Sequence, residues 1–139
     1  MNTNHPADLV LASLGHLDSE DVRLLWVDEY WDGLLEGMVE YRGARCLALV
    51  ADWEQVGAKD EERRWVLYRL TPEQQQDKER WHALFVQHVG THWDYTGARA
   101  GEPHPERFYG PFQARYRPPV LTREQAVGWF DSHPAGREA

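Results

Sequence analysis

Hydrophobic and polar positions alternate through much of the first half of the chain, and this pattern predicts a β-sheet. Four segments have the branched and aromatic composition of strands: residues 22–27, 35–41, 46–51 and 64–70. The second of them alternates in character along its length, whereas the third is apolar on both faces and suits a central strand. Arg42-Gly43 offers a tight hairpin turn between these two. Successive strands with short connections indicate an antiparallel meander.

After residue 70 the hydrophobic spacing changes to that of a helix. Thr71-Pro72-Glu73-Gln74 combines an N-cap hydroxyl, a proline at the first helical position and an amide three residues after the cap. The following residues place one side-chain stripe on a single helix face: Trp81, Leu84, Phe85 and His88. Gly90 is expected to end this helix, which we place at 72–89 and expect to lie on one face of the sheet.

The remainder of the chain is interrupted by proline and glycine, so we expect an irregular segment over residues 91–119. Within it, residues 112–117 could form an edge strand, because proline on either side bars them from the sheet interior. Thr122-Arg-Glu-Gln125 repeats the capping pattern and predicts a short C-terminal helix through Phe130, and a short N-terminal helix is expected over residues 7–14.

The predicted fold class is therefore α+β. It comprises an antiparallel sheet of four to five strands in a meander, a long helix on one face and a short C-terminal helix. The chain has 139 residues, a length that one hydrophobic core fills, so a single domain over 1–139 is expected.

The charge of the chain narrows the classes of partner. Its 23 acidic and 15 basic residues give a net charge of -8, and the whole excess lies in residues 1–60. A protein that neutralises phosphates needs the opposite balance, so nucleic acid is not expected as a partner. No apolar run approaches the about 20 residues needed to span a bilayer. A single cysteine and an N-terminus unlike a secretory signal favour a cytoplasmic protein.

Two motifs together resemble a group of small uncharacterised bacterial proteins. The motifs are Trp31-Asp-Gly-Leu-Leu-Glu-Gly37, before a hairpin, and Trp81-His-Ala-Leu-Phe85, which runs into Val89-Gly-Thr-His92. The resemblance spans roughly residues 24–95. It implies a bacterial, intracellular and compact protein, and it implies no activity, cofactor or catalytic residue.

The acidic, aromatic hairpin is the first candidate site. Its proposed partner-binding residues are Asp28, Glu29, Trp31, Asp32 and Glu36. Clustered carboxylates beside rings suit a cationic partner, because arginine pairs with carboxylates and stacks on aromatic faces. The leading hypothesis is thus a small acidic binding protein without a cofactor, inhibitor- or immunity-like, that engages a basic protein. The alternatives are a solvated outer sheet face, whose acids aid solubility, and a carboxylate pair for hydrolytic chemistry.

A histidine cluster is the second candidate site and supports a different class, a small metal-dependent or acid–base enzyme. His88, His92 and Asp94 could ligate zinc or iron or carry protons, with His104 as a further contributor from the irregular segment. His82 lies on another side of the helix, and Gly90 interrupts the spacing of the remaining pair. The structural alternative is that His82 lies on the flank of the helix, His88 packs in or near the core, and His92 caps the end of the helix.

Two further features are weaker. Arg115 and Arg117 would project from one face of the expected edge strand, where they could bind a phosphate or carboxylate, although pairing with the acidic hairpin is favoured. Cys46 lies within an apolar segment and is expected to be a small buried hydrophobic residue.

Overall fold

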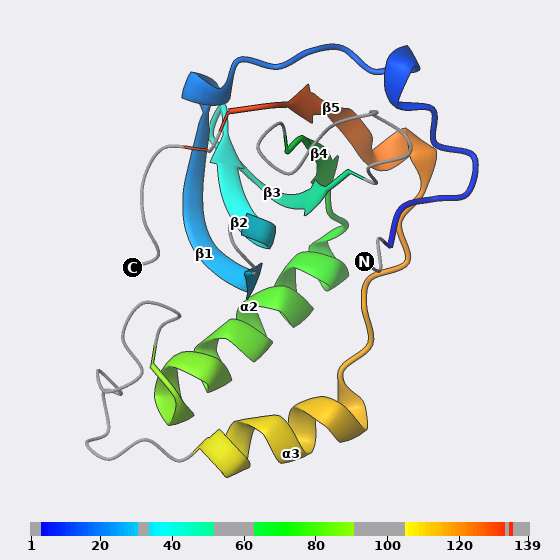
Figure 1. Cartoon of the computed structure of the whole chain (residues 1–139). Coiled ribbons are helices and arrows are strands. Elements are labelled where there is room, and N and C mark those ends of the chain that lie inside the picture. The colour runs from blue at the N-terminus through cyan, green and yellow to red at the C-terminus, as the bar shows by residue number, and fades with distance from the viewer. Residues whose placement is uncertain (1–3, 31–33, 52–62, 91–104, 133, 135–139) are drawn as a thin grey trace.

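Figure 1 shows a computed structural model of the chain, which describes residues 4–30, 34–51, 63–90, 105–132 and 134. A five-stranded antiparallel sheet has the order β1-β2-β3-β4-β5. Its strands are β1 (Val22–Tyr30), β2 (Leu34–Tyr41), β3 (Ala44–Val50), β4 (Trp65–Arg69) and β5 (Ala126–Phe130). Two described α-helices, α2 (Pro72–His88) and α3 (Pro105–Arg115), come between β4 and β5. The α+β class is therefore confirmed.

The first four strands pair in chain order, and local signals explain where they turn. Between β2 and β3, Arg42 and Gly43 have φ angles of 49° and 83°. Positive φ at both central residues is the requirement of the hairpin turn whose twist matches that of the strands. The predicted turn is thus confirmed, whereas β5 joins β4 only after both helices.

The sheet curves strongly, and one of its faces encloses an apolar core (Figure 1). Residues 15–17 close this curved sheet beside β5: Leu17 N–H donates to Trp129 O at 2.7 Å, and Trp129 N–H donates to Gly15 O at 3.0 Å. A Cβ on Gly128 would lie 2.7 Å from Gly15 O, so this approach requires glycine. The chain then enters β1 through a 3-10 turn at Ser19–Asp21, and one segment therefore links both edge strands.

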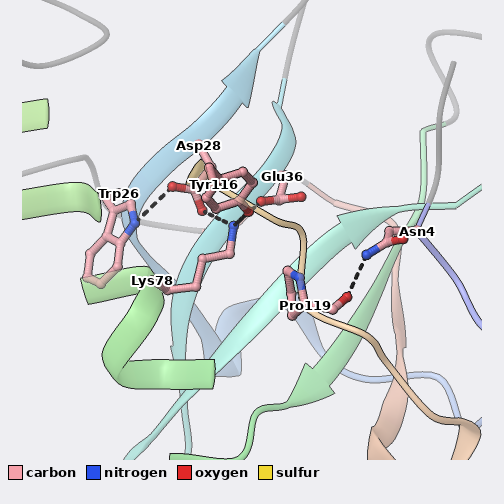
Figure 2. A network of polar contacts seen from close by, with 7 residues as sticks. All are labelled: Asn4, Trp26, Asp28, Glu36, Lys78, Tyr116 and Pro119. Atoms are coloured by element: carbon pink, nitrogen blue, oxygen red, sulfur yellow. Dashed lines mark hydrogen bonds and ion pairs between the residues drawn. The ribbon is translucent and has the colours of Figure 1, made fainter. Parts of the chain in front are cut away.

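The second face of the sheet carries another apolar cluster, which includes Trp26, Met38 and Tyr68. The N-terminal segment crosses this face, where the His5 ring lies 2.6 Å from Tyr68 Oη through Nδ1 and 2.7 Å from Val50 O through Nε2. Asn4 Nδ2 also donates to Pro119 O at 2.6 Å (Figure 2). These contacts tie the N-terminal segment both to the sheet and to the chain that comes after α3.

α2 begins as the sequence predicted. Thr71 Oγ1 accepts from Gln74 N–H at 3.2 Å, and Gln74 Oε1 accepts from Thr71 N–H at 3.0 Å, which completes a reciprocal cap. The helix meets the second sheet face through Lys78 and His82, while Trp81 and Phe85 pack against α3 in a layer rich in aromatic rings. α2 therefore lies partly on the sheet and partly on α3. Among the described helices, none is both long and apolar enough to cross a membrane.

The edge strand expected at residues 112–117 is wrong, and so is the irregular structure expected around it over residues 105–115. Residues 105–115 form α3, with Pro111 inside the helix. Phe108, Phe112 and Tyr116 are four residues apart, so they line up on one side of α3 and pack against α2. Burial of three rings outweighs the backbone hydrogen bond that Pro111 cannot donate. Residues 91–104 lie outside the described part of the chain.

The predicted C-terminal helix is also wrong. Thr122 and Gln125 do form the capping box, but around a 3-10 turn at Arg123–Gln125, after which the chain enters β5. The open edge of β4 provides a hydrogen-bonding partner that the local pattern does not reveal. In place of the expected N-terminal helix over 7–14, the structure has a 3-10 turn at Leu11–Ser13.

Candidate functional site

The end of the β1–β2 hairpin, α2 and α3 surround a cavity of about 150 Å³. Its wall is charged on one side, where Asp28 and Glu29 of β1 and Glu36 of β2 line it. Another part of the wall consists of α3 rings, including Phe108 and Phe112. α2 contributes Lys78, Trp81, His82 and Phe85, and Tyr116 lies just beyond α3. The cavity thus joins a carboxylate cluster to an aromatic surface.

Lys78 is the centre of the polar network at this cavity (Figure 2). Its ammonium donates to Asp28 Oδ2 at 3.4 Å, to Tyr116 Oη at 2.8 Å and to Glu36 Oε2. The side chains of Lys78 and Glu36 are only 4% and 13% exposed. Trp26 Nε1 donates to the other oxygen of Asp28 at 3.2 Å. Two acids from the sheet therefore share one cation from α2, and together they fix the helix against the hairpin.

The carboxyl groups of this network have perturbed acidities. Burial raises the pKa of Asp28 and of Glu36, and the attraction of Lys78 offsets this only in part. Glu29 is paired with Glu36 across the two strands, and partial burial together with the charge of Glu36 raises the pKa of Glu29. The site therefore has an excess of acidic groups, since three carboxyl groups and a single lysine line the cavity.

The pKa values of the lysine and the tyrosine in this network are also raised. Burial alone would lower the pKa of Lys78, but Asp28 and Glu36 raise it above its usual value, so the ammonium stays protonated. Burial, with a contribution from Glu36, raises the pKa of Tyr116 to about 12. The Tyr116 ring also lies 5.3 Å from Lys78 Nζ, as in a cation–π contact.

Aromatic rings build the rest of the cavity. Trp81 meets Phe108, Phe112 and Tyr116 edge-on, at centroid distances of 6.2, 5.6 and 6.0 Å. Phe112 in turn stacks on Tyr116 at 4.5 Å. Edge-on and stacked pairs hold rings in defined orientations, so these rings form a fixed aromatic wall beside the carboxylates.

On the sheet side, Trp26 links the network to α2 in a second way. Its ring stacks on His82 with a centroid distance of 4.3 Å and an interplanar angle of 6°. The guanidinium of Arg45 lies 5.7 Å from the same Trp26 ring and 3.4 Å from Glu79. His82 thus packs between the helix and the sheet and does not lie on the flank of α2, where the structural alternative placed it.

The structure places the acidic residues of the predicted partner site in two settings. Asp28 and Glu36 face α2 and are paired with Lys78, so they do not form a fully solvated outer sheet face. Glu29 is exposed at the edge of the cavity. Trp31 and Asp32 lie outside the described residues.

The metal-site prediction falls largely on residues that the structure does not describe. His92, Asp94 and His104 lie outside the described ranges, whereas His88 is half-buried at the end of α2. Among the described residues, no group of three histidine, cysteine or acidic side chains could hold a metal ion. The zinc or iron site at His88, His92 and Asp94 stays a prediction.

The arginine prediction is corrected, and the cysteine prediction is confirmed. Arg115 ends α3 and is exposed, while Arg117 donates to the backbone oxygen of Tyr116 at 2.8 Å. The cation that pairs with Asp28 and Glu36 is Lys78, which sequence reasoning missed. Cys46 is completely buried, and burial raises the pKa of its thiol.

A signal for the missed residue was present in the sequence. Lys78 lies three and four residues before Trp81 and His82, so it falls near the helix stripe that faces the protein. A lone lysine near such a stripe indicates a buried carboxylate partner.

Comparison of the chain with protein-family models, with curated proteins and with solved structures gives no significant match.

Proposed function

We propose that the protein binds a positively charged protein at the end of the β1–β2 hairpin, in the manner of an inhibitor or immunity protein. One observation carries the proposal: three carboxyl groups, Asp28, Glu29 and Glu36, border one cavity and have a single lysine among its lining residues. A cationic group from a partner would relieve the repulsion among these carboxylates. It would also gain a partly desolvated ion pair, which is stronger than one in water.

The distribution of charge along the chain supports the same partner class. The net charge of -8 arises entirely from residues 1–60, which include β1, β2 and the hairpin between them. A concentrated negative field steers a basic protein towards this end of the molecule and raises its association rate. Trp31 and Asp32 are proposed to extend the contact along the hairpin.

The test is a capture experiment with charge-reversed variants. Glu29→Lys changes an exposed side chain at the edge of the cavity, and Glu124→Lys makes the same charge change at an exposed position just before β5. We expect a basic protein to be captured by the wild type and by Glu124→Lys, and to be lost with Glu29→Lys. If Glu29→Lys captured the same proteins as the wild type, the proposal would be wrong.

Acid–base catalysis is a second candidate function, favoured by a specific observation. Asp28 and Glu36 border a cavity, and the pKa values of both carboxyl groups are raised. A carboxyl group with a raised pKa can serve as a general acid nearer to neutral pH. A screen of hydrolytic substrates tests it: turnover should appear with the wild type and disappear with Glu36→Gln, with circular dichroism as the check that the variant is folded. Turnover that survives Glu36→Gln would exclude this role for Glu36.

A further inference from the structure

We infer that the cavity accepts the side chain of an arginine, presented by the basic partner. The inference rests on the proposed function and specifies which group of the partner enters the site. It draws on two properties of the cavity, its volume and its unused acceptors, and on the geometry of the guanidinium itself.

The volume of the cavity matches that of a single side chain. Cavities that bind drug-sized molecules or cofactors have volumes of about 300–1,000 Å³. The present cavity measures about 150 Å³, about half of the lower limit. One long side chain would therefore fill the cavity, whereas a nucleotide or a flavin would extend largely outside it.

The polar wall has acceptors to spare. Lys78 directs its three N–H groups to Asp28, Glu36 and Tyr116, so the ammonium is saturated. Within the described part of the chain, Oε1 of Glu36 and both carboxylate oxygens of Glu29 accept no hydrogen bond. These two acids are directly opposite each other on β1 and β2. The wall thus selects a ligand that carries positive charge and several donors.

The number and direction of its donors distinguish a guanidinium from an ammonium. A guanidinium is planar and carries five N–H groups in a fixed fork, so it can bond two carboxylates at once. Glu29 and Glu36 lie opposite each other on β1 and β2, and their unused oxygens can accept from two sides of that fork. An ammonium is compact and strongly hydrated, and would lose its water for fewer directed bonds. The aliphatic stem of arginine would then cover Phe108.

Binding of small probes to the intact chain tests the inference without knowledge of the partner. The probe is N-acetyl-arginine methylamide, titrated into the wild-type protein and followed by changes in the NMR signals of the tryptophan indoles. The matched probes contain lysine, which keeps the charge, and citrulline, which keeps the planar shape. We expect millimolar binding of the arginine probe, and binding at least about tenfold weaker for the other two.

Variants locate the bound probe. Glu29→Gln changes an exposed side chain and should weaken the arginine probe several-fold, whereas Glu124→Gln should leave it unchanged. Glu36→Gln should weaken it further, with circular dichroism as the check that the variant is folded. Equal binding of arginine and lysine probes, or arginine binding that is insensitive to Glu29→Gln, would overturn the inference.

The two proposals fail in different ways. If Glu29→Lys abolishes capture of a basic protein but the arginine probe does not bind, the partner surface stands and the arginine pocket is wrong. If the arginine probe binds at Glu29 and Glu36 but Glu29→Lys still captures the same proteins as the wild type, the pocket stands and the proposed protein partner is wrong.

Discussion

The interior of the curved sheet and the layer between α2 and α3 are both buried, yet they are built in opposite ways. The sheet interior combines aliphatic and aromatic side chains from all five strands, and Phe130 in it stacks on Trp65 at 5.3 Å. The helical layer consists of rings from two helices and borders a cavity with a buried lysine and two carboxylates. The comparison indicates that the sheet provides most of the stability, while the helical layer retains a cavity and buried charged groups.

The largest effect is expected from a cavity in the sheet interior. Phe130 is fully buried and comes from the last strand, so Phe130→Ala removes a ring that contacts the core of the whole sheet. We expect a loss of about 3–5 kcal/mol in the free energy of unfolding. Urea denaturation followed by circular dichroism measures it, and a loss below about 1 kcal/mol would contradict the role assigned to the sheet.

The second effect concerns the buried cation. Lys78→Met leaves Asp28 and Glu36 without their partner, and the loss of one member of a buried ion pair costs about 3 kcal/mol or more. Arg80→Met is the matched control, since Arg80 is exposed on the same helix and its pair with Asp77 is worth less than about 1 kcal/mol. Equal stabilities of the two variants in urea denaturation would show that the network does not hold α2 to the hairpin.

A third substitution separates the helical layer from the sheet. Phe108→Ala removes the α3 ring that contacts both Trp81 and Phe85. We expect the free energy of unfolding to fall by about 2 kcal/mol, mostly because α3 detaches locally while the sheet stays folded. Hydrogen exchange should accelerate at residues 105–115 and stay slow in β2, β3 and β4. Uniform acceleration through the sheet would mean that the two regions unfold as one unit.

The smallest expected effect is a conformational stability that increases as the pH falls. The pKa values of Asp28, Glu29 and Glu36 are raised in the folded protein, so the folded state binds protons more readily than the unfolded chain. The resulting stabilisation is fully present below their ordinary values near 4 and is lost as the pH rises through the raised values. Unfolding midpoints should therefore increase slightly from pH 7 to pH 5, and Glu36→Gln should reduce that increase. A steady decrease that is the same in both proteins would contradict the assignment.

Elements with a local sequence signal were predictable. The turn at Arg42-Gly43 and the start of α2 depend on residues within one turn of each other, and both were placed correctly. The same capping signal at Thr122 and Gln125 misled, because hydrogen bonds to β4 make the next residues a strand and not a helix. A pattern within four residues cannot report a strand edge that lies far away in sequence.

The residues of the candidate site also divide into those that a local sequence pattern could identify and those that it could not. The acids at positions 28, 29 and 36 could be selected from the charge pattern, and the structure places all three at one cavity. Their cation could not be assigned, since Lys78 is 42 residues from Glu36 and comes from another element. The rings of Phe108, Phe112 and Tyr116 were hidden by Pro111, although their spacing of four residues is that of a helix face.

The closure of the sheet by residues 15–17 has a consequence for the order of folding. His16 lies 3.2 Å from Asp131, across a separation of 115 residues, so this contact closes nearly the longest loop available to the chain. Contacts between distant residues form slowly, because the entropy of loop closure is lost before the contact is gained. β1 to β4 can pair early, and until β5 arrives the outer edge of β4 exposes unpaired backbone groups. Aggregation during refolding is therefore the hazard that the last strand removes.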